Sequence, residues 1–308
     1  MPLLAVPTIQ PGDLGTSAYM NTYLRDNINT LIALVGPQNL LVNPGFEVYQ
    51  RGASVNSFNL AYMSDRWQLQ LGTSSSAIFN HITTTVDVGS STSLTATYTH
   101  AASTRLDQRI ENFRALQGKT VTFSIRIRKG LANSVRPYIS DSGSYTNGVS
   151  TTTTGAFETH TVTATISANA SAVTVGVEYL ATDISYLDNA VLAYGTFAPA
   201  YVPLDPQVDL ARCQRYYEVL GAHMTGVATA AGQTIGGWVS FATTKGGAPT
   251  VTKVGTWATN NCGQPTAVSR PGAETRGVTV YATSVAAGQV DCYITASSQA
   301  ITAEWNPA

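Results

Sequence analysis

The sequence predicts a mainly β protein with an N-terminal helix, a two-sheet β-sandwich and a second small β-domain. Three observations predict it: short segments alternate apolar and polar residues along most of the chain, one segment with a helical period precedes them, and prolines near residue 203 separate two groups of strands. We place an arm and helix at 1–38, the sandwich at 39–205 and the second domain at 206–308. A chain of 308 residues is long enough for two domains.

The predicted helix lies between Thr16 or Ser17, which are good N-caps, and Val35, after which Gly36 and Pro37 end it. Its apolar stripe consists of Met20, Leu24, Ile28, Leu31 and Val35. The stripe packs either on the chain's own β-domain or against copies of itself as a short coiled coil. We favour the oligomer because an isolated helix this short is marginal in water.

Strands are predicted wherever apolar residues recur at every second position. The clearest is Thr120–Lys129, whose apolar side chains alternate with Thr, Ser and Arg. The other strands expected in the sandwich are 94–98, 156–166, 172–180 and 186–194. Those expected in the second domain are 234–242, 251–257, 277–285, 289–296 and 301–305, after a segment at 207–220 that opens it.

Composition excludes several functional classes. Charged residues are only 11% of the chain, against about a quarter in an average protein, and Ser, Thr, Ala, Asn and Gly replace them. Neutral, hydroxyl-rich surfaces of this kind are typical of secreted β-proteins and virion fibres. With a formal net charge of −1 we expect neither nucleic acid nor a membrane as partner. Eight of the 17 Lys and Arg residues lie between Arg105 and Arg136, which suits either a polyanion or a subunit contact.

Motifs of enzymes and of secretion are missing from the sequence. The first residues, MPLLAVPTIQPGD, have no basic region, and no apolar run is long enough to span a bilayer. There is no GxSxG, HExxH or P-loop motif, and the four histidines are isolated, so we expect no catalytic residue and no enzyme. Cys213, Cys262 and Cys292 are expected as buried free thiols, with a Cys262–Cys292 disulfide as the alternative.

Two short segments at the ends of the sandwich region, Asn43-Pro-Gly-Phe-Glu47 and Tyr186-Leu-Asp-Asn-Ala-Val191, resemble the carbohydrate-binding jelly rolls attached to glycan-degrading enzymes. The resemblance implies a jelly-roll fold in which these segments are neighbours in one sheet. It also implies a structural calcium with Glu47 and Asp188 as ligands. The alternative is that both carboxylates form hydrogen bonds that tie strand ends.

Sugar binding needs aromatic faces for the apolar side of a pyranose and planar polar groups for its hydroxyls. The glycan-binding candidates, which we expect on loops or outer faces, are Tyr62, Tyr138, Tyr145, Arg126 and Arg128. For each of them a packing role is the alternative. Trp67 is expected in the core.

Three segments resemble those of phage tail-fibre and other virion structural proteins. The first is Met20-Asn-Thr-Tyr-Leu-Arg-Asp-Asn27, within the predicted helix. The second opens the sandwich with Asn39-Leu40-Leu41, Asn43, Gly45-Phe46 and Gln50-Arg51-Gly52, followed by Asp65-Arg66-Trp67. The third is Asp209-Leu-Ala-Arg-Cys-Gln-Arg-Tyr-Tyr-Glu218, at the domain boundary, whose Cys213, Tyr216 and Tyr217 we expect in the junction, with Arg212 and Arg215 paired to Asp209 and Glu218.

The resemblance implies a homotrimer on the surface of a phage particle, attached to other virion proteins through residues 1–38. Three functions follow. The first is a fibre or adhesin whose β-domains contact host surface polysaccharide. The second is a capsid-decorating or cement protein without a ligand. The third is a glycan hydrolase or its detached glycan-binding module.

Overall fold

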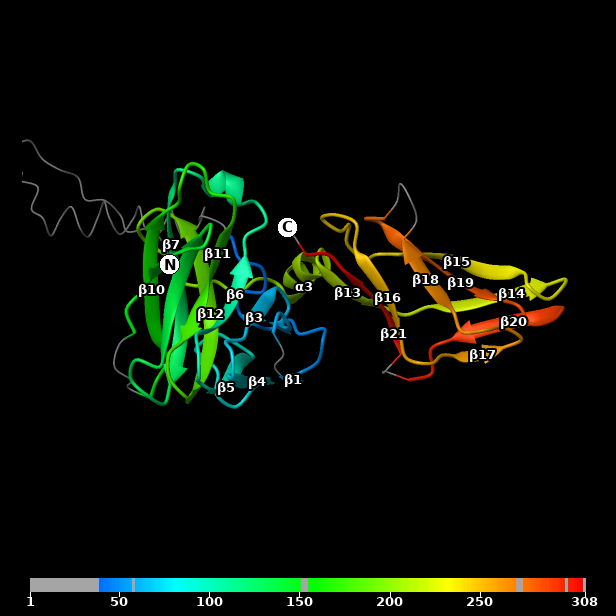
Figure 1. Cartoon of the computed structure of the whole chain (residues 1–308), viewed down its shortest axis with the longest axis horizontal. Coiled ribbons are helices and arrows are strands. Elements are labelled where there is room, and N and C mark those ends of the chain that lie inside the picture. Colours follow the sequence, from blue (N-terminus) through cyan, green and yellow to red (C-terminus); the bar gives the residue numbers. More distant parts are fainter. Residues whose placement is uncertain (1–38, 57–58, 151–154, 270–273, 297–298, 307–308) are drawn as a thin grey trace, which may run out of the picture.

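The computed structural model describes residues 39–56, 59–150, 155–269, 274–296 and 299–306. The predicted N-terminal helix, with its stripe of Met20, Leu24, Ile28, Leu31 and Val35, lies outside the described residues. The described part is mainly β, as predicted, and its two groups of strands follow one another along the long axis (Figure 1). The exact limits of the three predicted domains stay a prediction.

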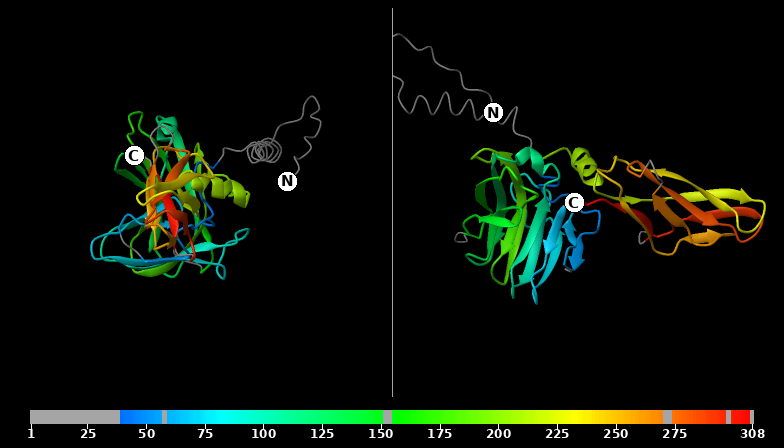
Figure 2. Two further views of the ribbon diagram at one scale, coloured as in Figure 1. Left: turned by 90° about the vertical axis from the view of Figure 1, so that its right-hand side faces the viewer. Right: turned by 45° about the horizontal axis from the view of Figure 1, so that its top comes forward.

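The first β-unit is a sandwich of two antiparallel sheets that face each other (Figures 1 and 2). Sheet A has the order β1 (Ser54–Asn56), β4 (Ser76–Ile82), β5 (Ser93–Thr99), β12 (Asp183–Tyr194), β7 (Thr120–Lys129) and β10 (Glu158–Thr165). Sheet B has the order β2 (Tyr62–Ser64), β3 (Trp67–Gln70), β6 (Thr104–Arg109), β11 (Val173–Tyr179), β8 (Val135–Asp141) and β9 (Ser144–Asn147). A 3-10 turn, η2 (Phe113–Leu116), connects β6 with β7.

Alternation along the strands places the core between the sheets. Strand β7 has the predicted bounds, and its four apolar side chains are buried: Val121, Phe123, Ile125 and Ile127. They face the apolar residues of β11 and β8 in sheet B within one continuous cluster. Trp67 is completely buried in this cluster, which confirms the prediction that it belongs to the core.

The opening segment of the sandwich lies along β12, an inner strand of sheet A. The Leu40 amide donates to the Leu192 carbonyl at 3.0 Å, and the Ala190 amide donates to the Pro44 carbonyl at 2.9 Å. The Asn39 side chain accepts from the Leu192 amide and donates to the Ala190 carbonyl, so it substitutes for a further backbone pairing. The two segments that were expected to be neighbours are therefore hydrogen-bonded to each other.

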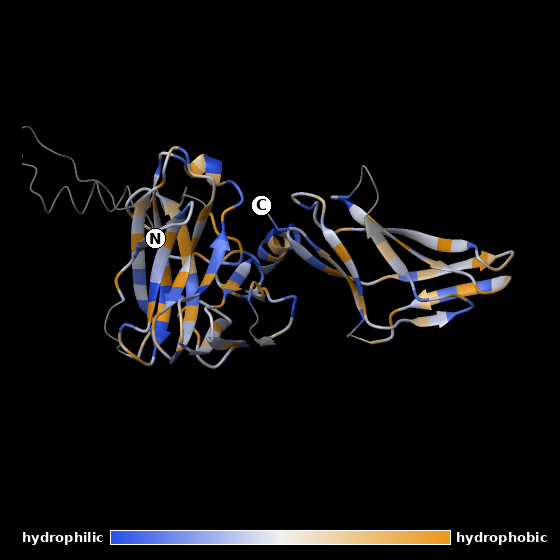
Figure 3. Cartoon of the chain, viewed as in Figure 1, coloured by the Kyte–Doolittle hydropathy of each residue, from blue (hydrophilic) through white to orange (hydrophobic). Residues whose placement is uncertain are grey.

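The second β-unit consists of three small antiparallel sheets, each with three strands. One sheet joins β13 (Tyr217–Leu220), β21 (Ala300–Glu304) and β16 (Thr250–Val254); another joins β14 (His223–Ala228), β20 (Gly288–Tyr293) and β17 (Ala258–Asn260); the third joins β15 (Thr234–Ser240), β19 (Gly277–Thr283) and β18 (Thr266–Ser269). It has its own, smaller apolar core. Hydrophobic bands alternate with polar ones along its strands, as they do in the sandwich (Figure 3).

A short helix, α3 (Pro206–Gln214), connects the two units and was not expected from the sequence. Asp205 caps it by accepting from the Gln207 and Val208 amides, and Pro206 occupies its first turn, where no amide hydrogen is needed. Its nine residues carry too few apolar side chains to give a helical period. None of the described helices is long and apolar enough to cross a membrane.

The three cysteines are free and buried. Cys213 lies in the contact between the two units, and Cys262 and Cys292 lie in the core of the second unit. The Cys262 thiol donates to the Asp291 carbonyl at 3.3 Å. The chain therefore carries the free thiols that were expected and not the alternative disulfide.

Candidate functional site

The outer side of sheet B, which we call the sheet B face, gathers charged and aromatic side chains from four adjacent strands. Its charged and aromatic residues include Arg105, Asp107, Arg136, Tyr138, Tyr145 and Glu178. In the strand register Gly176 lies between Asp107 and Tyr138, and Glu178 lies between Arg105 and Arg136. The face is therefore built as two neighbouring rows across the sheet.

In the first row, Tyr138 crosses strand β11 and its hydroxyl donates to Asp107 Oδ2 at 2.6 Å. This crossing requires glycine at position 176, where a Cβ would lie 2.7 Å from the Asp107 Cβ. Burial raises the pKa of Asp107 to about 6, although the hydrogen bond from Tyr138 and the charge of Arg105 act to lower it.

Tyr138 itself is only 1% exposed, so its ring cannot stack on a sugar. It lies on an outer face, as expected, but it has the packing role that was the alternative. It does point outward from sheet B, but Tyr145, at a ring-centroid distance of 5.5 Å, and the Arg105 guanidinium, at 5.7 Å, lie against it. Sequence periodicity predicts the side of the sheet on which a side chain lies. It does not predict whether neighbouring side chains cover it.

In the second row, Glu178 is held between two guanidinium groups. Arg105 donates to its Oε1 at 2.7 Å, and Arg136 donates to its Oε2 from Nε at 2.8 Å and from Nη2 at 2.6 Å. Burial alone would raise the pKa of Glu178, but the hydrogen bonds and charges of Arg136 and Arg105 lower it below its ordinary value. This row is a fixed, ionised cluster.

Tyr145 is the aromatic residue that the sheet B face exposes, with 44% of its surface open. The Arg105 guanidinium lies 4.3 Å from its ring centroid and restricts its position. An exposed ring beside braced planar polar groups can stack on the apolar side of a pyranose and bind its hydroxyls. Arg105, Arg136 and Glu178 were not among the predicted site residues, because their proximity arises from strand pairing across 42 and 73 positions.

The two predicted arginines lie on the opposite side of the sandwich, on the outer face of sheet A. Arg126 forms a two-pronged ion pair with Asp87, at 2.6 and 2.9 Å. It borders a shallow hollow of about 420 Å³ that Thr159 and Tyr201 also line. Arg128 lies beside Tyr186, with its guanidinium 5.4 Å from the ring centroid. The predicted arginines therefore do not share a site with Tyr138 and Tyr145.

Tyr62 lies on edge strand β2 of sheet B, where the sandwich meets the second β-unit, and its register with Gln68 and Asp107 puts it on the same outer side as the sheet B face. Its hydroxyl donates to Asn306 Oδ1 at 2.6 Å, and the Arg51 guanidinium lies 4.7 Å from its ring centroid. Its contacts link the units, as in the packing alternative. Of the five glycan-binding candidates, three therefore lie on the outer side of sheet B, with Tyr62 at its edge, and the two arginines lie on the outer side of sheet A.

The two candidate calcium ligands, Glu47 and Asp188, both bind the loop that precedes β5. Glu47 accepts from the Ser91 amide and hydroxyl at 3.0 and 2.9 Å. Asp188 accepts from the Asp87 amide and the Ser90 hydroxyl at 3.1 and 2.9 Å. Burial raises the pKa of Asp188 to about 7, although these hydrogen bonds act to lower it.

These carboxylates therefore form the hydrogen bonds that the alternative reading expected. The part of the chain that the structure describes contains no group of three or more His, Cys, Asp or Glu side chains able to hold a metal ion. The donors around Asp188 are amide and hydroxyl hydrogens, which a bound cation would have to displace. The calcium site implied by the resemblance stays a prediction.

Two of the three segments that resemble phage proteins meet where the two units are in contact, and the third, residues 20–27, lies outside the described residues. We call this region the joint; it comprises residues 39–56 and 59–67, Glu111, residues 205–218 and the end of β21 with Trp305. Its centre is Asn43, whose amide donates to Asp209 Oδ1 at 3.1 Å and whose carbonyl accepts from Trp67 Nε1 at 2.9 Å. The Asn43 side chain also binds the Val48 backbone and the Ser64 hydroxyl. Asn43 thus connects the opening segment of the sandwich with residues 65–67 and with helix α3.

Arg51 crosses the joint from the sandwich to the second unit. It pairs with Asp65 at 2.7 Å within the sandwich and with Glu304 at 3.2 Å in strand β21. Its guanidinium lies 3.5 Å from the ring centroid of Tyr217. Cys213, Val42 and Tyr216 form a small apolar cluster beside it, onto which Trp305 packs. The prediction that Cys213, Tyr216 and Tyr217 lie in the junction between the units is confirmed.

The ion pairs predicted for this segment are wrong. Arg212 donates to the Leu41 carbonyl at 2.6 Å, and Arg215 forms two hydrogen bonds with Glu111, at 2.6 and 3.1 Å. Neither arginine pairs with Asp209 or Glu218. The acceptors come from the sandwich, more than 100 residues away, and a single sequence cannot indicate them.

No protein-family model and no curated protein sequence matches the chain. Among solved structures, the chain is similar to the CBM22-1 xylan-binding domain of Xyn10C from Paenibacillus barcinonensis, with 11% identity and a TM-score of 0.38 over 53% of this chain and 97% of that chain. It is also similar to a putative sugar-binding protein from Bacteroides thetaiotaomicron, with 13% identity and a TM-score of 0.38 over 51% of this chain and 100% of that chain.

A further similarity is to the enzymatically active domain of tailspike protein 4 of bacteriophage CBA120, with 10% identity and a TM-score of 0.32 over 51% of this chain and 21% of that chain. At TM-scores this low the similarities say nothing about a ligand. The strand pairings themselves establish that the first β-unit is a two-sheet sandwich.

Proposed function

We propose that the chain is a structural protein of a phage virion, a fibre or adhesin-type appendage whose sandwich contacts glycans of the host surface. The virion assignment is supported by the three segments that resemble phage proteins, two of which meet in the joint. In this proposal residues 1–38 attach the chain to other virion proteins and the β-units project from the particle.

The observation that carries the glycan contact is the sheet B face. Tyr145 is 44% exposed and lies next to Arg105, which is itself held by Glu178. Groups fixed in this way lose little conformational freedom when a ligand binds, which lowers the entropic cost of binding. Ser140, the strand partner of Tyr145 on β8, adds a hydroxyl-bearing side chain next to the ring.

We further propose that the protein is a homotrimer held by the stripe at 20–35. One shallow face with one exposed ring binds a glycan weakly. Three linked faces convert the second and third contacts into intramolecular ones and raise the overall affinity by about 10²–10⁴-fold. Sedimentation of the full chain tests this: we expect the mass of a trimer, and a Leu24→Glu, Ile28→Glu variant is expected to sediment as a monomer.

An array of bacterial surface polysaccharides, probed with the full chain, tests the glycan contact. We expect binding that Tyr145→Ala weakens at least about tenfold. Tyr186→Ala on the outer face of sheet A is the matched control and is expected to bind like the wild type. Equal losses in both variants, or no binding to any polysaccharide, would contradict a glycan site on the sheet B face.

One observation favours the second function, capsid decoration without a ligand. On the sheet B face Asp107 is bonded to Tyr138 and Glu178 to two arginines, so these acids already have partners within the chain. Phage particles that lack the protein distinguish the two functions. Loss of resistance to heat or dilution with unchanged host adsorption would support decoration, whereas loss of adsorption supports the adhesin.

The same two acids bear on the third function, glycan hydrolysis. A glycosidase needs two carboxyl groups that reach the substrate. Asp107 is 3% exposed and Glu178 is also 3% exposed, with both of its oxygens bound to arginine. We therefore propose no catalytic activity for this face. Release of reducing ends from a host polysaccharide by the purified chain would contradict this.

A further inference from the structure

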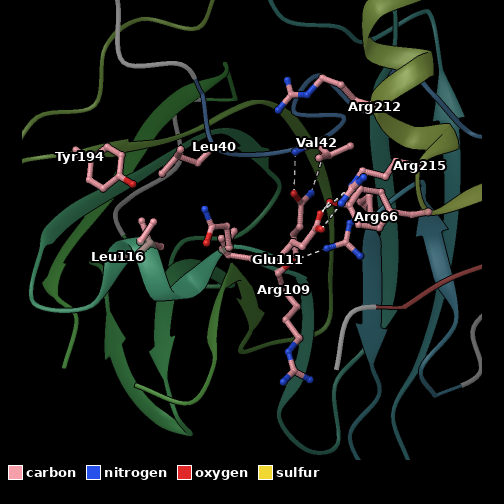
Figure 4. Close-up of a pocket in the computed structure, with 14 residues that line it drawn as sticks. Leu40, Val42, Arg66, Arg109, Glu111, Leu116, Tyr194, Arg212 and Arg215 are labelled. Atoms are coloured by element: carbon pink, nitrogen blue, oxygen red, sulfur yellow. Dashed lines mark hydrogen bonds and ion pairs between the residues drawn. The ribbon is translucent and has the colours of Figure 1, made fainter. Parts of the chain in front are cut away.

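A cavity of about 260 Å³ lies at the joint, between the sandwich and helix α3 (Figure 4). Leu40, Leu116 and Tyr194 gather at one end of it. Arg66 and Arg215 lie at the other end beside Glu111, and Arg212 extends from α3 above them. The cavity thus has an apolar half and a cationic half, and it is separate from the sheet B face.

Arg66 is the unusual residue of this cavity. It is only 4% exposed, yet its one hydrogen bond goes to the Arg109 carbonyl, at 2.5 Å, and its Nε has no partner in the part of the chain that the structure describes. Its guanidinium lies 3.9 Å from the Tyr216 ring centroid, which covers one face and leaves the donors at its edge available. A buried cation with an unpartnered donor and a single acceptor costs free energy, which a bound anion would recover.

The backbone of Arg66 is also strained. Its φ of 72° lies in the left-handed region, which costs a residue other than glycine roughly 1–2 kcal/mol. The turn between β2 and β3 therefore holds this side chain toward the joint at an energetic cost. A rigid joint around it maintains that position, since Trp67, the next residue, is fully buried.

The other charged groups of the cavity leave an excess of positive charge. Glu111 is the carboxylate that lines it, and Glu111 is already bound by Arg215 and by the Tyr216 hydroxyl. Arg212 is bonded to backbone carbonyls and not to an acid. Arg109 also borders the cavity, but its guanidinium points away from this group (Figure 4).

We propose that this cavity binds a single acidic monosaccharide unit, with its carboxylate on Arg66 and its ring against Leu40, Leu116 and Tyr194. Guanidinium groups bind carboxylates through paired, charge-assisted hydrogen bonds. A volume of about 260 Å³ accommodates one hexuronate ring and not a longer oligosaccharide. The arginines lead us to expect a carboxylate group on the ligand. That the ligand is a sugar rests on the proposed glycan contact.

Titration of the full chain with sodium glucuronate, followed by amide NMR shifts, tests the proposal. We expect saturable shifts at residues 110–116 and 194, and no saturable shifts there with glucose, which lacks the carboxylate. Sodium acetate is expected to bind at least about tenfold more weakly than glucuronate. If acetate binds as tightly as glucuronate, the claim that the cavity recognises a sugar is contradicted. If glucuronate does not bind, the claim that the cavity is a binding site is contradicted.

Three variants locate the binding. Ala115→Phe fills the cavity from the exposed turn η2 without changing charge, and Arg66→Gln removes the buried cation; each is expected to weaken glucuronate binding at least about tenfold. Arg114→Gln is the matched control, since Arg114 is exposed on the same turn and does not line the cavity. Arg114→Gln is expected to bind within about twofold of the wild type.

If Arg66→Gln fails to fold, Ala115→Phe still decides the question. Wild-type affinity in Ala115→Phe, or an equal loss in Arg114→Gln, would show attraction by surface charge alone and overturn the proposal. Tyr145→Ala separates this site from the proposed function: it is expected to lose array binding while it retains glucuronate. Array binding without any glucuronate binding overturns the cavity and leaves the sheet B face intact.

Discussion

The joint and the sheet B face are built from the same residue types, arginines, acids and tyrosines, but they use them differently. At the joint the residues come from segments more than 100 positions apart and close on one another, as Arg215 does on Glu111. On the sheet B face they come from adjacent strands, and Tyr145 stays 44% exposed. The comparison shows that arginines held by ion pairs can serve two purposes. They can join two units, or they can fix the position of a tyrosine ring that stays exposed to solvent.

One acid from each region, Glu111 at the joint and Asp107 on the face, has its pKa shifted in the opposite direction from the other. At the joint, Glu111 is half-buried between Arg215 and the Tyr216 hydroxyl, and although burial alone would raise its pKa these contacts lower it. On the face, burial dominates and raises the pKa of Asp107 to about 6. Substitutions of Asp107 and of Glu111 should therefore differ in their dependence on pH.

The largest expected effect is at the joint. Asn43→Ala removes the side chain that binds the Val48 backbone and Ser64, and leaves buried donors and acceptors without partners. We expect the free energy of unfolding to fall by about 3 kcal/mol. Urea unfolding measures it, with Tyr145→Ala as the control on the face, expected within about 0.5 kcal/mol of the wild type. Similar values for both would mean that Asn43 does not hold the joint.

A smaller effect is expected beneath the face. In Gly176→Ala the new Cβ would lie 2.2 Å from the Leu106 carbonyl oxygen, so strand β11 or β6 must shift. We expect a loss of about 2 kcal/mol and a weaker Tyr138–Asp107 hydrogen bond. Gly237→Ala in β15, where the added Cβ meets nothing within 4 Å, is the matched control. An unchanged melting temperature in Gly176→Ala would contradict the close approach of Tyr138 and Asp107.

The smallest expected effect is the direction in which protein stability changes with pH. Because the folded pKa of Asp107, about 6, exceeds its unfolded value near 3.9, the folded state binds the proton more readily. The wild type should therefore gain stability relative to Asp107→Asn as the pH falls from about 7 to about 4. Glu111 has a lowered pKa, so its contribution is present above the unfolded value near 4.3 and is lost at lower pH.

The wild type should accordingly lose stability relative to Glu111→Gln as the pH falls below about 4.3. Melting temperatures of the three proteins between pH 3 and 7.5 give both differences directly. Differences that change in the same direction with pH would contradict the contrast between the two acids.

The sequence predicted local structure better than contacts. Alternation located β7 and its buried face because the period of a strand is a property of consecutive residues. Helix α3 escaped notice because its nine residues are mostly polar and are held by a cap and a proline. Tyr138 was placed on the correct side of its strand, but its burial depends on Tyr145 and Arg105, which only the paired strands bring to it.

The segment at 209–218 was correctly expected in the contact between the units. The hydrogen-bond partners inside the joint, however, could not be predicted. Asn43 and Asp209 are 166 positions apart, and nothing within either segment names the other as its partner. The same holds for the cavity, since Arg66 becomes a functional candidate only when the structure shows it buried with an unpartnered Nε.

Electron microscopy of intact phage particles, labelled with gold-conjugated antibodies raised against residues 206–308, tests the central claim that this chain is an outward-projecting part of a virion. We expect label on appendages or on the particle surface, at a distance from the attachment point of residues 1–38. Particles without label, with the protein recovered only in the soluble fraction of the lysate, would contradict the claim.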